Sequence, residues 1–339
     1  MATLKEIAEK AGVSITTVSH VLNGTRPVSD SLKKRVLEAM EALGVEPRFL
    51  SRKKPSQLIA MLIDDIFNPF FTEVFAAAEA TARSMGYHLL LLPSIERGSD
   101  ILYLRDLEEK SVDGIIVATR LGIPYLKKAF STQLPMVFLG GSLDVPFSTS
   151  VLLPDETGTY LATKHLLSLG HTEILCLGGP AKFSLFRDRF QGYIKALREA
   201  GIPETSYHTV ELSLTFQEAY AFGLEFLAKH PRKVTAVLTH NDPAALGILK
   251  AAQYLGIQVP EDLSIVGFDN TYVTEYTNPP LTSVDIPKKI IGKRLVELLV
   301  RLIRGNHVEP CVIEDASLSV KGSTAPKRKE ERSWRNGQK

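Results

Sequence analysis

The chain has 339 residues, of which 44% are hydrophobic and 23% are charged, and its formal net charge is +2. This length is enough for a small domain and a larger body with substantial cores. No apolar run approaches the roughly 18 residues that a membrane-spanning helix requires. The first residues also leave no room for a secretory signal. We therefore expect no membrane partner and a location in the cytoplasm.

Cysteine usage points to the same compartment. Cys176 and Cys311 both lie in apolar, strand-like segments, and no cluster of cysteine and histidine has the spacing of metal ligands. The sequence therefore predicts two core thiols in a reducing environment, with no metal site and no cofactor.

Residues 4–23 predict two short helices joined by a tight turn. Hydrophobic residues recur at helical spacing over 4–11 and give that segment one apolar stripe. Gly12 supplies the backbone freedom that the turn needs. Ser14 suits the cap position of the second helix, because its hydroxyl can accept a backbone N–H. In that second helix, Val18 and Leu22 belong to the buried stripe.

The opposite face of the second helix carries Ile15, Thr16, Ser19 and His20. Hydroxyl and imidazole groups can bond base edges or phosphates, and isoleucine can contact a thymine methyl group. Two helices joined in this way can place the second one in the major groove of DNA. The alternative is an ordinary helical hairpin with a solvated face.

A third short helix follows, capped by Ser29 and ended by Gly44. Three such helices can close a small core. The first 54 residues carry a net charge of +4, whereas residues 55–320 carry −7. This asymmetry is expected when only one end of a chain meets phosphates.

From residue 58 onward, short apolar runs alternate with helical patterns, which is typical of parallel sheets flanked by helices. The predicted strands form two groups: 58–63, 88–92, 114–117, 136–139 and 150–153, then 174–177, 235–238, 264–268 and 282–284. The predicted helices are 70–85, 101–110, 156–169, 187–200, 216–229, 243–255 and 288–304. We therefore expect an α/β body of two doubly wound parallel sheets, followed by a disordered basic tail over 323–339.

Several predicted strands end in polar residues, at the edge of a parallel sheet where ligands bind. Asp65, Asn241 and Asp269 occupy such positions, and Arg189 lies on a predicted helix. An arginine fork together with carboxylates and amides can bond both the donors and the acceptors of sugar-like hydroxyls. Each of these residues could instead cap a helix or form a surface ion pair.

Residues 1–47 resemble the headpiece of the lactose-repressor/galactose-repressor (LacI/GalR) family of regulators. The runs 3–8, 11–14 and 17–24 carry the resemblance, and 28–29 and 35–36 fit it as well. The resemblance implies a helix-turn-helix DNA-binding domain. The residues that it implies in DNA contact are Thr3, Ser14, Ile15, Thr16, Thr17, His20, Asn23, Arg26 and Arg52.

The resemblance continues to about residue 322, through segments such as 68–71, 112–116, 187–193, 239–242 and 265–270. It implies a body similar to periplasmic binding proteins, with an effector in the cleft between two lobes. The domains that follow are a headpiece (1–47), a linker (48–57), and a body (58–322) whose first lobe is 58–153 plus 285–312 and whose second is 154–284 plus 313–322. The effector-binding residues implied are Asp65, Phe70, Phe71, Arg189, Asn241 and Asp269.

The chain departs from the family pattern in three places. Gly140 and Gly141 stand where the family often has an acidic or aromatic residue, which removes a wall for stacking and argues against a purine ring there. Pro154 and Asp155 replace the usual Asp-Asn pair. The linker is shorter and has Lys54 near the position of a leucine that wedges into the minor groove.

The linker residues predict a weaker DNA kink than is usual in the family. Pro55 disfavours a helical conformation at Lys54, so any hinge helix is short. Leu50 could substitute as the wedge, but the basic run 52–54 suits phosphate contacts better. Omitting the wedge avoids the few kcal/mol that unstacking a base step costs.

Together these features predict a sequence-specific DNA-binding transcriptional regulator, acting as a repressor associated with the bacterial nucleoid. It binds a near-palindromic double-stranded operator as a homodimer, because one small headpiece binds weakly. A small polar effector, a sugar or sugar-like molecule, switches its operator affinity by allostery.

Two other classes of function compete with this prediction. A two-lobed solute-binding receptor without DNA function is disfavoured by the basic headpiece and by the missing signal. An enzyme is disfavoured because the chain has no nucleophile motif, no phosphate-binding loop and no catalytic residues that we can place.

Overall fold

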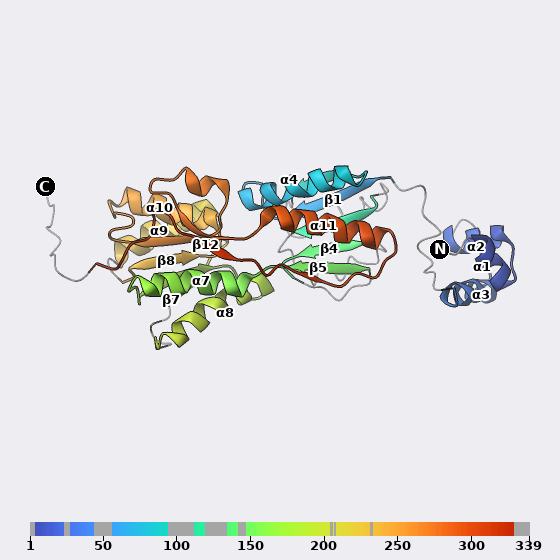
Figure 1. The fold of residues 1–339 in the computed structure, drawn as a ribbon, viewed down its shortest axis with the longest axis horizontal. Helices are drawn as coiled ribbons and strands as arrows, with labels where there is room; N and C mark the ends of the chain where they lie inside the picture. The colour runs from blue at the N-terminus through green and yellow to red at the C-terminus, as the bar shows by residue number, and fades with distance from the viewer. Residues whose placement is uncertain are drawn as a thin grey trace.

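The computed structural model describes residues 4–23, 28–43, 56–93, 112–118, 134–141, 147–203, 206, 208–230 and 233–328. Three helices form the N-terminal headpiece, and two six-stranded sheets with their helices form the body (Figure 1). Among the described helices, none has the length and hydrophobicity needed to cross a membrane.

The headpiece consists of α1 (Leu4–Ala11), α2 (Ile15–Asn23) and α3 (Asp30–Glu41). Ile7, Val18, Val36 and Met40 are fully buried in its core, as their helical spacing predicts. Gly12 forms the turn with a φ of +61°, and the Arg35 guanidinium donates to the carbonyls of Ala11 and Gly12. The third helix therefore ties down the turn that orients the second.

The first lobe is a parallel sheet with the strand order β11-β5-β4-β3-β1-β2. Its strands are β1 (Leu58–Ile63), β2 (His88–Pro93), β3 (Gly114–Ala118), β4 (Met136–Leu139), β5 (Ser148–Leu152) and β11 (Cys311–Val312). Helices α4 (Pro69–Ser84) and α11 (Lys288–Ile303) pack against each other and against this sheet. Side chains on both faces of β1 and β3 are buried, which is why the sequences of these strands are continuous apolar runs.

The second lobe has the strand order β12-β10-β9-β8-β6-β7, with only β12 antiparallel. Its strands are β6 (Ile174–Gly178), β7 (His208–Glu211), β8 (Ala236–Thr239), β9 (Ser264–Asp269), β10 (Thr282–Asp285) and β12 (Ser317–Ser319). Its helices are α7 (Asp155–Ser168), α8 (Ser184–Glu199), α9 (Phe216–Lys229), α10 (Asp242–Tyr254) and the 3-10 turn η3 (Tyr272–Glu275). Helices α7 and α8 pack as one pair and α9 and α10 as another.

The chain crosses between the two sheets three times: between β5 and α7, between β10 and α11, and between β11 and β12. Direct contacts also join the lobes beside the crossings. The backbone N–H of Tyr272 donates to the Glu73 carboxylate at 3.0 Å. The Ser184 hydroxyl donates to the Gly140 carbonyl at 3.4 Å.

Several sequence predictions need correction. The tail predicted from residue 323 is held for six residues at least, because Ser323 is buried and the Lys327 N–H donates to the Leu169 carbonyl. Strands β7, β11 and β12 were missed, because these edge strands of two to four residues lack the apolar runs of the inner strands. Helix α8 begins at Ser184 rather than Arg187. Cys176 is in the core, but Cys311 is only half-buried.

Two further predictions concern helix ends. Ser29 takes the cap position of α3, but its hydroxyl bonds Ser31 and no backbone N–H. The predicted helix over 101–110, the residue Gly44 and most of the linker lie outside the described residues. The last two linker residues are described: the N–H groups of Ser56 and Gln57 donate to the Asp113 carboxylate at 3.2 and 2.8 Å.

The packing of α11 on α4 depends on Gly292. A Cβ at this position would lie 2.8 Å from the Ala78 nitrogen and 2.9 Å from the Ala77 Cβ, closer than such atoms approach. We predict that Gly292→Ala lowers the free energy of unfolding by about 1–3 kcal/mol, because the helices must move apart. Urea denaturation measures this, and Lys293→Ala on the exposed side of the same helix is the control, with a change within about 0.5 kcal/mol. Equal stability of the two variants would contradict the prediction.

Candidate effector pocket and nucleic-acid interface

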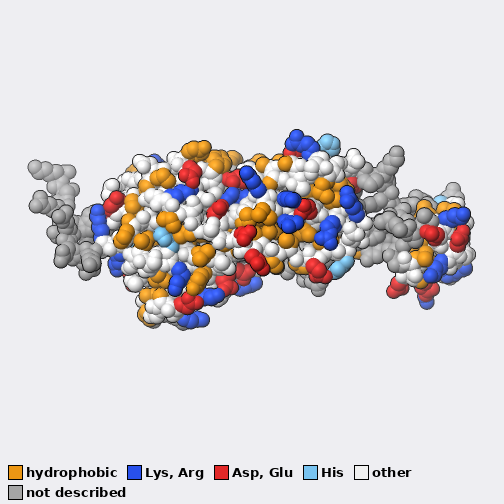
Figure 2. Space-filling model, in the orientation of Figure 1, with side chains coloured by type: hydrophobic (Ala, Val, Ile, Leu, Met, Phe, Trp, Pro, Cys, Tyr) orange, Lys and Arg blue, Asp and Glu red, His pale blue; other side chains and the backbone are white. Residues whose placement is uncertain are grey.

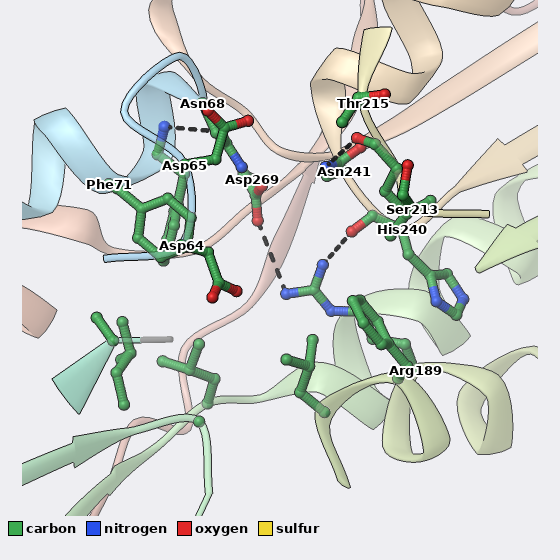
Figure 3. A pocket seen from close by; sticks show the side chains of 18 residues that line it. Asp64, Asp65, Asn68, Phe71, Arg189, Ser213, Thr215, His240, Asn241 and Asp269 are labelled. Carbon is green, nitrogen blue, oxygen red and sulfur yellow. Dashed lines mark hydrogen bonds and ion pairs between the residues drawn. The ribbon is translucent and has the colours of Figure 1, made fainter. Parts of the chain in front are cut away.

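A pocket lies between the carboxyl ends of strands from both lobes, and it encloses about 740 Å³ of space, part of it open to solvent. The first lobe contributes residues at the carboxyl ends of β1, β3, β4 and β5 and from the start of α4. The second contributes residues at the carboxyl ends of β7, β8 and β9 and on α8. All six residues predicted to bind an effector line this pocket: Asp65, Phe70, Phe71, Arg189, Asn241 and Asp269. Figure 3 shows the polar members converging from opposite sides.

Arg189 is the central side chain of the pocket, and it is only 5% exposed. Its Nε donates to the Asp155 carboxylate at 2.7 Å, and its Nη1 donates to the backbone carbonyl of His240. Its Nη2 lies 3.7 Å from the Asp269 carboxylate. The guanidinium also stacks on the Phe268 ring, 3.6 Å from the ring centroid. Arg189 thus connects α8 with α7, β8 and β9.

Burial dominates the electrostatics around Arg189. It raises the pKa of Asp155 and raises the pKa of Asp269 well above its ordinary value, and the Arg189 charge opposes both shifts. Burial lowers the pKa of His240 to about 3, and the nearby Arg189 adds to that fall. His240 is therefore a neutral imidazole at physiological pH, paired with Cys176 at 3.3 Å.

Asp269 occupies an unusual backbone conformation for a residue with a side chain, with a φ of +102°. Lys288 holds the carbonyls of Asp269 and Asn270 at 2.5 and 3.0 Å and also bonds the Asp285 carboxylate. Lys288 is the first residue of α11, which packs on the first sheet. The strand end that presents Asp269 is therefore anchored to a helix of the other lobe.

Two of the predicted pocket residues also serve the local backbone. The Asn241 side chain caps α10 by accepting from the Ala244 N–H, and it donates to the Leu214 carbonyl at 2.9 Å. The Asp65 carboxylate accepts from the Phe67 N–H at 2.8 Å. The helix-cap interpretation considered for such positions thus describes part of the role of Asn241, whereas Asp65 bonds the turn before α4, whose cap is Asn68.

Sequence reasoning missed two residues that hold the pocket together, Asp155 and His240. The departure from the family pattern at Pro154 and Asp155 marked the first position without assigning it a partner. No sequence pattern identifies His240 as a partner of Arg189, because the contact is made by its backbone carbonyl and not by its side chain. Asp242, the residue after Asn241, is fully buried and accepts hydrogen bonds from Thr271 and Ser283.

The second candidate surface is the outer face of α2. Ile15 is 49% exposed and Thr16 is also exposed, so both can reach a partner. The Ser14 hydroxyl accepts from the Thr17 N–H at 3.0 Å and so caps the helix, and the Thr17 hydroxyl bonds Ser14. His20 is half-buried.

Four of the residues predicted to contact DNA are described in part or not at all. Thr3, Arg26 and Arg52 lie outside the described residues, and only the backbone of Asn23 is described. On the face of the headpiece seen in Figure 2, basic and acidic side chains are both present. The net positive charge of this end of the chain is therefore not a uniform basic surface on that side.

Comparisons with known proteins find relatives of both the headpiece and the body. Residues 3–48 match the family described as "Bacterial regulatory proteins, lacI family", and residues 163–324 match a periplasmic binding protein-like domain. The HTH-type transcriptional repressor PurR of Aliivibrio salmonicida is 36% identical over 322 residues, covering 93% of this chain and 96% of that protein.

Solved structures show the same architecture. A LacI family regulator from Enterococcus faecium with bound ribose is 29% identical, with a TM-score of 0.73, over 80% of this chain and all of that chain. The lac repressor dimer bound to operator and an anti-inducer is 27% identical, with a TM-score of 0.69, over 96% of this chain and 99% of the other.

The buried Asp242 carboxyl gives a pH-dependent test of this region. Burial raises its pKa to about 6, and hydrogen bonds from Ser283 and Thr271 limit the rise. A pKa above the ordinary value means that the native state favours the protonated form, so this stabilisation is full below pH 4 and is lost as the pH rises through 6. We predict that Asp242→Asn gains stability relative to the wild type as the pH rises from 4 to 7.

Urea denaturation at several pH values measures this difference. Asp262→Asn, at a residue whose carboxylate pairs with Arg328 at 2.8 Å on the far side of the lobe, controls for general charge effects. A difference between Asp242→Asn and the wild type that stays constant across the range would contradict the assignment.

Proposed function

The chain belongs to the lacI family of bacterial regulatory proteins, and we propose that it is a transcriptional repressor whose operator affinity is switched by a small polar effector. The observation that carries this proposal is a lacI-type headpiece on the same chain as a pocket lined from two lobes. We take the effector to be a sugar or sugar-like molecule, since a relative of this architecture is known with bound ribose. The protein acts as a regulator rather than as an enzyme, in the bacterial cytoplasm.

The DNA interface of this proposal is the outer face of α2 with its flanking residues. In this interface, base edges are read by Ile15, Thr16 and His20. Contacts of Thr17 and the capping Ser14 with the DNA phosphates position the helix. Thr3, Asn23, Arg26 and Arg52 complete the set. The lac repressor is known as a dimer on its operator, and a dimer makes the second headpiece's binding intramolecular.

The effector site of this proposal is the pocket around Arg189 and Asp269. The guanidinium and the carboxylate bind ligand hydroxyls from one side, with Asn241 beside them. Asp65 and Phe71 contact the ligand from the first lobe, and Phe70, which packs edge-on against Phe71 with a centroid distance of 5.3 Å, supports that wall. A ligand that touches both lobes favours one relative position of the lobes over others.

The connection to DNA runs through the first lobe. The linker enters this lobe at Ser56 and Gln57, whose N–H groups are held by the buried Asp113 at the start of β3. A change in the angle between the lobes therefore alters the spacing of the two linkers in a dimer. A coupling of about 1–3 kcal/mol between effector and operator is sufficient for a switch. We retain the predicted division into headpiece (1–47), linker (48–57) and body (58–322) for this scheme.

The headpiece assignment predicts that His20→Ala relaxes sequence preference. On DNA selected by the wild-type protein from a random pool, we expect a loss of about 1–3 kcal/mol in discrimination at one or two base pairs. Lys34→Ala is the matched control: its side chain is largely exposed, so it weakens binding evenly across sequences, if at all. Gel-shift titration on specific and random DNA measures both. Equal losses for His20→Ala on the two DNAs would exclude His20 as a base reader.

The pocket assignment predicts that Arg189→Ala abolishes the effector response and leaves operator binding intact. A thermal-shift screen of sugars, sugar phosphates and nucleosides on the full chain first identifies a ligand. Gel shifts with that ligand then compare Arg189→Ala with Arg187→Ala, an exposed arginine on the same helix. A normal response in Arg189→Ala would remove Arg189 from the site, and circular dichroism checks that the variant is folded.

A further inference from the structure

The backbone that presents Asp269 to the pocket adopts an unfavourable conformation. Asp269 has a φ of +102°, which residues with side chains rarely adopt, and Asn270 follows it in the left-handed region with a φ of +46°. Such conformations persist only where surrounding groups hold them, and they are concentrated at ligand sites and switches. The groups that hold these two residues therefore control how Asp269 meets a ligand.

Lys288 holds both residues from a helix of the other lobe. Its Nζ donates to the Asp269 carbonyl at 2.5 Å and to the Asn270 carbonyl at 3.0 Å. The side chain is only 11% exposed, so water competes little for these charge-assisted hydrogen bonds. Lys288 is the first residue of α11, and Figure 1 shows this helix beginning near the junction of the lobes and running along the first sheet.

The Lys288 ammonium spans the second of the three crossovers. Residues 286 and 287 alone separate β10 of the second sheet from α11. The Asp285 carboxylate, at the end of β10, accepts from the ammonium at 3.1 Å, and the Ile286 carbonyl in the crossover lies 3.4 Å away. A rotation of the first lobe turns α11, so it moves the base of the Lys288 side chain relative to Asp269.

A second contact from the first lobe reaches the same segment. The Glu73 carboxylate on α4 accepts from the Tyr272 N–H at 3.0 Å. Because α4 and α11 pack against each other, Glu73 and Lys288 move together with the first lobe. From inside the second lobe, the Asp242 carboxylate accepts from the Thr271 N–H at 2.7 Å and from its hydroxyl at 2.8 Å. Residues 269–272 are thus held from both lobes.

Lys321 holds this segment from within the second lobe. It follows β12, which pairs with β10 of the second sheet. Its Nζ donates to the Asn270 Oδ1 at 2.8 Å and to the Thr274 Oγ1 at 2.6 Å, and it pairs with Glu275 at 2.6 Å. Its side chain is 10% exposed, nearly as Lys288 is. The two lysines are therefore matched in burial and in contact with Asn270, but differ in the lobe from which they come.

We propose that Lys288 is a positioning residue that ties the angle between the lobes to the conformation of Asp269. At the angle of this structure, the ammonium reaches both carbonyls and the Asp269 carboxylate lies 3.7 Å from the Arg189 Nη2. At another angle one or both bonds are lost, and the strand end relaxes. A ligand that needs Asp269 in place therefore selects the angle at which Lys288 bonds both carbonyls. This last step rests on the proposed function of the pocket.

The tie is tested first without a ligand, by measuring the distance between the lobes in the full chain. Spin labels at Lys293→Cys on α11 and Glu225→Cys on α9 report this distance by pulsed electron spin resonance. Both side chains are exposed, by 60% and 66%. The background is Cys311→Ser, and Cys176 is buried and stays unlabelled. Dilution with unlabelled protein removes distances between protomers.

In this measurement we expect Lys288→Met to broaden the distribution of distances about twofold, because the lobes sample more angles. Lys321→Met is the matched control and should keep the wild-type distribution, since its contacts lie within one lobe. A wild-type distribution in Lys288→Met would overturn the inference, and so would equal broadening in both variants. If Lys288→Met does not fold, Glu73→Ala replaces it, and an unchanged distribution there would count equally against the tie.

The effect on regulation is measured separately, by gel shift on DNA that the wild-type protein selects from a random pool. D-Ribose, D-glucose, D-galactose and cellobiose are the probes. For a probe that changes the DNA affinity of the wild type, we expect the change to shrink to about twofold or less in Lys288→Met and to persist in Lys321→Met. A full wild-type response in Lys288→Met would overturn the inference. No response of the wild type to any probe would contradict the proposed sugar effector, while the distance measurement still decides on Lys288.

Discussion

The architecture of the pocket depends on one buried cation, the Arg189 guanidinium. A buried charge is tolerated only when it is paired and hydrogen-bonded, and here the partners come from three different elements. Asp155 at the start of α7, the carbonyl after β8 and Asp269 at the end of β9 all converge on it, with Phe268 beneath. Because each partner belongs to a separate part of the second lobe, satisfying this charge also fixes the relative positions of those parts.

The same region connects the two lobes. Lys288 begins a helix that packs on the first sheet, yet its ammonium holds the backbone that presents Asp269 in the second. The Glu73 carboxylate receives the N–H of Tyr272 from the other lobe. At the opposite end of the strands of the first sheet, the Asp113 carboxylate accepts hydrogen bonds from Ser56 and Gln57, where the linker enters. The pocket and the linker entry thus lie at the two ends of one sheet, which is the arrangement that the proposed switch uses.

The described residues that line the pocket come from the ends of neighbouring strands in each sheet. Ala118, Leu139 and Leu153 lie at the ends of β3, β4 and β5, which are neighbours in the first sheet. Gly140, directly after β4, lines the pocket between the ends of these strands. His240, Asn241 and Asp269 lie at the ends of β8 and β9, which are neighbours in the second. The lining of the pocket is therefore determined by the pairing of strands within each sheet and not by any single residue.

The sequence by itself determined the elements with strong periodicity, because local patterns encode them: the headpiece helices and the apolar strands. It also indicated the helical residue Arg189 and the strand-end residues Asn241 and Asp269, all of which line the pocket. Only the tertiary structure decided the partners of those residues. Asp155 lies 34 positions before Arg189, and no local pattern relates them. The same reason explains why the sequence did not indicate the short strands β11 and β12 or the structure of residues 323–328. These segments are stabilised by pairing with distant parts of the chain. Such contacts contribute free energy only after the fold has brought the segments together.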